Sequence, residues 1–170
     1  MSAPLADVVR RLETVLSAEE RLYLRLREVL RREESELLGL DASELEATVA
    51  EKRALAEEAK LLEESRRIVM VELGVGLGLG EEPVKLSRLI AQLGPEAGGL
   101  PGLHGRLRAL VGSTRALLEG NERFASRSLV RVQETLRMLG RAIPEETVGY
   151  GRRPRSSGQV GRGRLVRQAI

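Results

Sequence analysis

A run of alternating glycines, Gly74-Val-Gly-Leu-Gly-Leu-Gly80, is the first feature of the sequence that could hold a ligand. Glycine-rich loops bind phosphate groups when a strand precedes them and set residues, such as a Lys-Ser/Thr pair, follow at fixed spacing. The run has neither the dinucleotide nor the phosphate-binding spacing, and no basic residue follows it closely. It therefore predicts a flexible connector between helices.

Titratable side chains offer little more chemistry. His104 is the only histidine and cysteine is absent, so a transition-metal site would need carboxylates for its other ligands, which is unusual. Adjacent acids occur at Glu19-Glu20, Glu33-Glu34, Glu57-Glu58 and Glu63-Glu64. On the polar faces of helices beside arginines, such acids are typical of solvated ion pairs. We expect no catalytic residue, no metal and no cofactor, so the protein is not expected to be an enzyme.

The composition predicts an all-α protein. Leucine dominates the apolar residues of the 170-residue chain, whereas aromatic residues make up only 2%. This favours seams between helices over a core built around large rings. No apolar run is long enough to span a bilayer, and charged residues interrupt the N-terminal apolar positions. We therefore expect a soluble cytoplasmic protein without stable membrane insertion.

Heptad spacing predicts an elongated antiparallel hairpin of two long helices. The first begins near Pro4, with Ser2 as its cap, and ends at Gly39. Its a positions are Leu5, Leu12, Glu19, Leu26 and Glu33, and its apolar stripe is wide enough for a bundle. The second begins in a capping box of Asp41 and Glu44 and ends in the glycine run, with Lys52 and Arg66 inside its stripe. The short link between the helices requires a tight reversal.

Two further helices follow. Glu81, Glu82 and Pro83 suit the first turn of a short helix that ends at Gly94-Pro95, after which a loop is expected to Gly102. A long helix is expected from about Leu103 to Ala142. Its packing face is predicted to contain Leu103, Leu107, Leu110, Leu117, Phe124, Leu129, Val132, Leu136, Leu139 and Ile143.

Polar residues interrupt this face at a spacing of seven, at Thr114, Asn121 and Ser128. A buried asparagine often fixes the register of packed helices. A polar layer within the bundle is one interpretation, and the other is a surface to which a partner helix adds, oriented by Asn121.

A change of composition at Pro144 divides the chain into a helical body, residues 1–144, and a tail, residues 145–170. The tail contains six arginines against two glutamates, whereas the body is close to neutral. Its composition predicts a flexible basic Gly/Arg-rich segment. Tyr150 lies between glycines in this segment, so it either folds back on the bundle or projects as a short anchor for a partner.

These segments together resemble the FlgN family of flagellar export chaperones. The resemblance lies in Glu36-Leu37-Leu38, Asp41…Leu45…Glu51-Lys52…Leu55, Leu61-Leu62-Glu63-x-x-Arg66, Asn121-Glu-Arg-Phe124…Leu129…Leu136-x-x-Leu139 and Tyr150-Gly151. The chain departs from the family at Phe124-Ala125, where a second asparagine and a glycine are usual, and at Arg152-Arg153-Pro154, which alters the usual Tyr-Gly-x-x-Gly.

The resemblance implies a cytoplasmic chaperone that binds the C-terminal helical segments of the hook-associated proteins FlgK and FlgL and delivers them to the export gate protein FlhA. The client-binding residues are expected in the long C-terminal helix, and the gate contact is carried over to Tyr150. The client-binding set is Asn121, Leu129, Val132, Leu136, Leu139 and Ile143.

Two other functions stay open on the sequence. A coiled-coil adaptor or structural protein would self-associate through the same stripe, and a homo-oligomer is compatible with either function. A nucleic-acid-binding arm would use the arginines of the tail to neutralise phosphates. The tail contains no lysine and lacks interleaved aromatic residues, so nucleic acid is not the expected partner.

Overall fold

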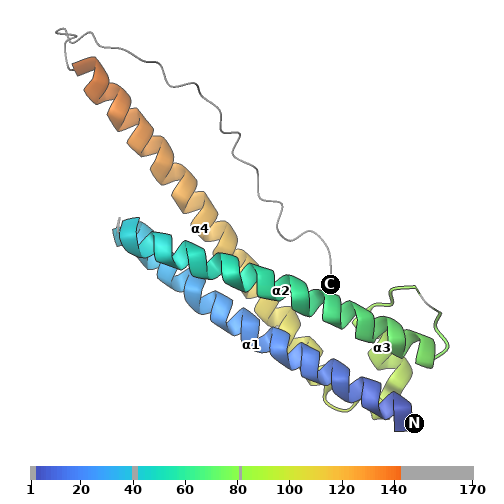
Figure 1. Ribbon diagram of the computed structural model, residues 1–170. Coiled ribbons are helices and arrows are strands. Elements are labelled where there is room, and N and C mark those ends of the chain that lie inside the picture. The colour runs from blue at the N-terminus through green and yellow to red at the C-terminus, as the bar shows by residue number, and fades with distance from the viewer. Residues whose placement is uncertain (1–2, 40–41, 81, 143–170) are drawn as a thin grey trace, which may run out of the picture. The chain divides into compact units, whose positions relative to one another are not determined.

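The computed structural model describes residues 3–39, 42–80 and 82–142, all of which lie in helices or in the links between them (Figure 1). The helices are α1 (Ala3–Gly39), α2 (Ala42–Gly76), α3 (Leu86–Leu93) and α4 (Leu100–Ala142), with a 3-10 helix, η1 (Gly94–Ala97), before α4. None of the described residues lies in a strand. The all-α prediction is confirmed.

Helices α1 and α2 pack along their length as the antiparallel hairpin that the heptads predict (Figure 1). The expected cap Ser2 and capping-box residue Asp41 lie outside the described residues. Leu12 and Leu16 of α1 are buried against Val69 and Leu73 of α2, together with residues of α3 and the start of α4. A second, smaller apolar cluster joins Leu22 and Val29 of α1 to Leu55 of α2.

The short helix α3 begins later than predicted. Lys85 is extended, with φ −62° and ψ 140°, and the exposed Glu82 and Pro83 lie before the helix rather than in its first turn. Burial decides this start, because Leu86, Leu89 and Leu93 all enter the larger apolar cluster. The predicted end is confirmed, since Gly94 takes φ +56° and is the C-cap of α3.

The long helix α4 begins three residues earlier than predicted, at Leu100, and η1 replaces part of the expected loop. Glu13 of α1 explains the early start, since its carboxylate accepts a hydrogen bond from the backbone N–H of Gly99 at 2.7 Å. Gly98 has φ +54°, and a Cβ there would lie 3.0 Å from the same carboxylate oxygen. A glycine therefore meets both requirements of this turn.

The chain divides into two compact units, residues 1–126 and residues 127–170. The first contains the hairpin, α3 and α4 as far as Ser126, and the described part of the second is the rest of α4. The division that the sequence predicts at Pro144 lies outside the described residues.

Candidate functional site

Two buried acids of α1 meet two bases of α2 inside the hairpin. Glu19 forms an ion pair with Arg66, with 3.1 Å between the carboxylate oxygen and the guanidinium nitrogen, and Glu33 forms an ion pair with Lys52. The two pairs are separated by 14 residues along α1 and by 14 residues along α2, which corresponds to about four helical turns, or about 21 Å. The Glu19–Arg66 pair lies in the sequence between the two apolar clusters of the hairpin. These pairs fix the antiparallel register, because a slip would leave charges buried without partners.

The Glu19 carboxyl is the most perturbed titratable group of the hairpin. Burial raises its pKa from 4.5 to about 7, while the Arg66 guanidinium opposes this rise and Glu63 adds to it. The same environment raises the pKa of the neighbouring Tyr23 hydroxyl, again chiefly through burial. We interpret the Glu19–Arg66 pair as a structural feature of the hairpin, because the carboxylate of Glu19 is already paired with the guanidinium of Arg66.

Asn121 joins α4 to this framework. Its side chain is 4% exposed, and its amide nitrogen donates to the backbone oxygen of Leu30 at 2.7 Å and to the carboxylate of Glu33 at 3.0 Å. Since Glu33 also binds Lys52, one polar contact network crosses α4, α1 and α2. Asn121 therefore supports the predicted polar layer, and in this structure its amide nitrogen is engaged within the chain.

The other two polar positions of α4 behave differently. Thr114 is buried, and its hydroxyl donates to the carbonyl of Leu110 in its own helix at 2.7 Å. Ser128 is half-buried. Phe124, predicted on the packing face, is 38% exposed. That expectation is wrong because the packed face of α4 continues from Asn121 to Ala125, one helical turn further along, and Phe124 lies beside this face.

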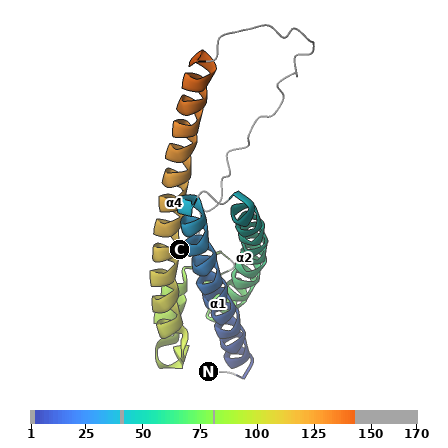
Figure 2. The same ribbon diagram turned by 90° about the vertical axis from the view of Figure 1, so that its left-hand side faces the viewer.

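Helices α1 and α4 run parallel with a nearly constant register. Glu13 contacts Gly99 and Glu20 contacts Arg106, each 86 residues away, and Glu33 contacts Asn121, 88 residues away. Figure 2 shows the parallel course of the two helices. At this register Gly39, where α1 ends, corresponds to about Ser126 of α4.

The stripe continues beyond Ser126 as a face of apolar side chains, which we call the α4 C-terminal face. Its members are Leu129, Val132, Leu136 and Leu139, spaced three and four residues apart, and each is more than half exposed. Every other described side chain from 131 to 140 is also exposed. The structure therefore leaves four of the predicted client-binding residues together on one helix, uncovered by any described residue.

Two predicted site residues cannot be placed. Ile143, the next apolar position of the stripe, and Tyr150, the predicted gate contact, lie outside the described residues.

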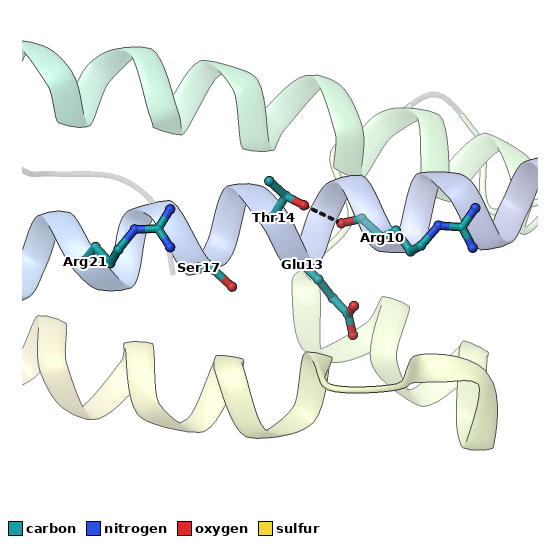
Figure 3. Close-up of a pocket in the computed structure, with 5 residues that line it drawn as sticks. All are labelled: Arg10, Glu13, Thr14, Ser17 and Arg21. Carbon is teal, nitrogen blue, oxygen red and sulfur yellow. Dashed lines mark hydrogen bonds between the residues drawn. The ribbon is translucent and has the colours of Figure 1, made fainter.

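A polar hollow on α1 is lined by Arg10, Glu13, Thr14, Ser17 and Arg21 (Figure 3). Glu13 points toward the start of α4, where its carboxylate accepts the N–H of Gly99. The Thr14 hydroxyl donates to the carbonyl of Arg10 at 2.9 Å. Both polar groups thus have structural partners within the protein.

The described residues contain neither a candidate metal site nor a candidate membrane span. Residues 3–39, 42–80 and 82–142 contain no group of three or more His, Asp or Glu side chains that could hold a metal ion. No helix in those ranges is both long enough and apolar enough to cross a bilayer.

The two buried ion pairs were not predicted from the sequence, although the sequence contains a signal for them. Glu19 and Glu33 occupy a positions of the first heptad series, and Lys52 and Arg66 lie in the stripe of the second at the same separation. Matching these separations in antiparallel order predicts both pairs and the register of the hairpin.

Comparison with known protein families gives a match. The sequence profile of a family described as FlgN protein matches residues 1–157. Neither a curated protein nor a solved structure matches the chain significantly. The profile covers both long helices of the hairpin, α3, α4 and the start of the following segment, so the chain belongs to the FlgN family.

Proposed function

We propose that this protein is a cytoplasmic flagellar export chaperone that binds the C-terminal helical segments of FlgK and FlgL and delivers them to the export gate protein FlhA. Membership of the FlgN family supports the chaperone function. The observation that carries the binding step is the α4 C-terminal face, where a row of apolar side chains has no cover from the described residues. An amphipathic client helix buries its own apolar stripe by packing on such a face.

In this proposal the two parts of the chain have separate roles. Residues 1–126 form the support, with Asn121 anchoring α4 to α1 close to where the exposed face begins. The α4 C-terminal face holds the client, extended by Ile143. Tyr150, in the following segment, contacts the gate.

The test is binding of purified FlgK and FlgL C-terminal segments to the full chain and to Leu136→Asp. A charge in the middle of the apolar contact should weaken client binding at least tenfold. Leu61→Asp is the matched control, because Leu61 is also an exposed leucine, in α2, with 72% of its surface accessible against 62% for Leu136. It should bind clients as the unmodified chain does.

Equal loss in both variants, or none in either, would exclude the α4 C-terminal face as the client site. Tyr150→Ala should keep client binding and lose binding to FlhA. Constitutive self-association without affinity for either segment would instead support the adaptor function.

A further inference from the structure

The borders of the α4 C-terminal face contain a charge pattern that the apolar residues alone do not explain. With Leu129 and Leu136 at a and Val132 and Leu139 at d, the inner border positions e and g hold uncharged residues. These are Ser128, Gln133, Thr135 and Gly140. Just outside them, Arg137 occupies b on one side and Arg131 occupies c on the other.

Both border arginines are available to a partner. Arg131 and Arg137 are exposed, and no ion pair within residues 127–140 or to the other described ranges involves either of them. An arginine side chain lays its methylene groups along apolar surface and carries its guanidinium several ångströms further. The two guanidinium groups can therefore reach across the uncharged inner border to a helix packed on the face.

The net charge of residues 127–142 also determines which kind of helix can pack on the α4 C-terminal face. Residues 127–142 contain four arginines against the single acid Glu134, so their net charge is +3. A second copy would bring the same positive charge to the face and would be repelled. A helix with acidic borders would be attracted and would be held in one register.

We infer that the α4 C-terminal face selects client helices whose apolar stripe is bordered by aspartate or glutamate, which pair with Arg131 and Arg137. The inference rests on the proposed function for the identity of the clients, and adds the chemistry by which the face recognises them. The leucines and valine supply contact area, while the arginines supply register and discriminate against basic or neutral helices.

The experiment measures binding of the FlgK and FlgL segments to the full chain, to Arg131→Glu/Arg137→Glu and to Arg127→Glu, at about 50 mM and about 500 mM salt. Arg127 is the matched control for the charge change, because it is exposed on the same helix at position f, on the opposite side from the stripe. Arginine and glutamate have similar helix propensities, so circular dichroism should show the same helix content in all three proteins.

The double variant should bind at least tenfold more weakly at low salt and lose the weakening that added salt causes in the full chain. Arg127→Glu should change binding less than about threefold. If client binding is normal in the full chain and the double variant matches Arg127→Glu, the inference is overturned and the proposed function stands.

A pair of designed peptides tests the same chemistry without a flagellar client. Both carry leucine at a and d of about three heptads, and one has glutamate at the b and c border positions where its twin has lysine. The full chain should bind the glutamate peptide at least tenfold more tightly at low salt. Equal binding, or binding of neither peptide, overturns the inference. Absence of FlgK and FlgL binding, with discrimination between the peptides retained, overturns the proposed function alone.

Discussion

Asn121 is the residue at which the polar contacts of three helices meet. Its single amide nitrogen serves both a backbone carbonyl and a carboxylate of α1, and that carboxylate also neutralises Lys52 of α2. Leucine at this position would bury more apolar area but would leave the carbonyl of Leu30 and part of Glu33 without this donor. Such a residue specifies an arrangement more than it adds stability, which is the usual effect of buried asparagine at helix seams.

Asn121→Ala should lower the free energy of unfolding by about 1–3 kcal/mol, because the carbonyl of Leu30 and the carboxylate of Glu33 each lose one buried donor. Urea unfolding followed by circular dichroism measures this loss. Gln133→Ala, at an exposed position of the same helix, should change stability by less than about 0.5 kcal/mol. Similar stabilities of the two variants would show that the contact with Leu30 and Glu33 does not hold α4 in place.

The sequence allowed only part of this residue-level arrangement to be predicted. The spacing of Thr114, Asn121 and Ser128 indicated a polar layer, and the structure confirms a bridging role for Asn121 alone. Spacing shows that residues share a helix face, but not whether a hydroxyl binds its own helix, as Thr114 does. The position of Leu30 opposite Asn121 depends on the register between α1 and α4, which no local pattern contains.

At the scale of elements, the hairpin is a series of apolar clusters and buried ion pairs. The apolar clusters supply the driving force, at roughly 25 cal/mol for each Å² of apolar surface buried. The ion pairs restrict the register, at the cost of removing charges from water. Two helix starts also depended on tertiary contacts: α3 begins where Leu86 enters the core rather than at the predicted first-turn residues Glu82 and Pro83, and α4 begins early where Glu13 of α1 accepts the N–H of Gly99. Tertiary contacts outweighed local preference at both starts.

The hairpin should become less stable as the pH rises from 5 to 8. The pKa of Glu19 is about 7 in the folded protein and near 4.5 when the chain is unfolded, so the folded state holds this proton more tightly. Over the interval between these two values the unfolded state binds fewer protons, and stability falls with increasing pH by about 3 kcal/mol at most. At pH values above or below this interval, Glu19 does not make the free energy of unfolding depend on pH.

Urea unfolding at several pH values from 5 to 8 measures this dependence in the full chain and in Glu19→Gln. The variant should lose most of the slope, because glutamine does not titrate. Glu20→Gln is the matched control, since the hydrogen bond from Arg106 lowers the pKa of the adjacent Glu20, which places its titration below the interval. An unchanged slope in Glu19→Gln would assign the pH dependence to another group.

For the whole molecule, the distribution of burial separates the compact unit from the exposed part of α4 that we propose as the client site. Among residues 4–39, 42–80 and 82–140, every buried side chain lies at or before Asn121, whereas the apolar residues from Leu129 to Leu139 are exposed. The family resemblance predicted the client surface in this half of the helix, but no pattern in the sequence predicted that the compact unit ends at Ser126. That boundary depends on where α1 ends relative to α4, a long-range property of the register.

A chain truncated after Ser126 should therefore fold and unfold like the full protein. It keeps both apolar clusters, both buried ion pairs and the contacts of Asn121, so its thermal midpoint should lie within about 3 °C of that of the full chain. It should also lose all binding to the FlgK and FlgL segments, because the α4 C-terminal face has been removed. Calorimetry and client binding measure the two properties separately.

A truncation after Ala142, which retains the α4 C-terminal face, should bind clients but should not bind FlhA. A truncated chain of 126 residues that is unstable would mean that residues beyond Ser126 support the fold, and retained client binding would move the site into the hairpin.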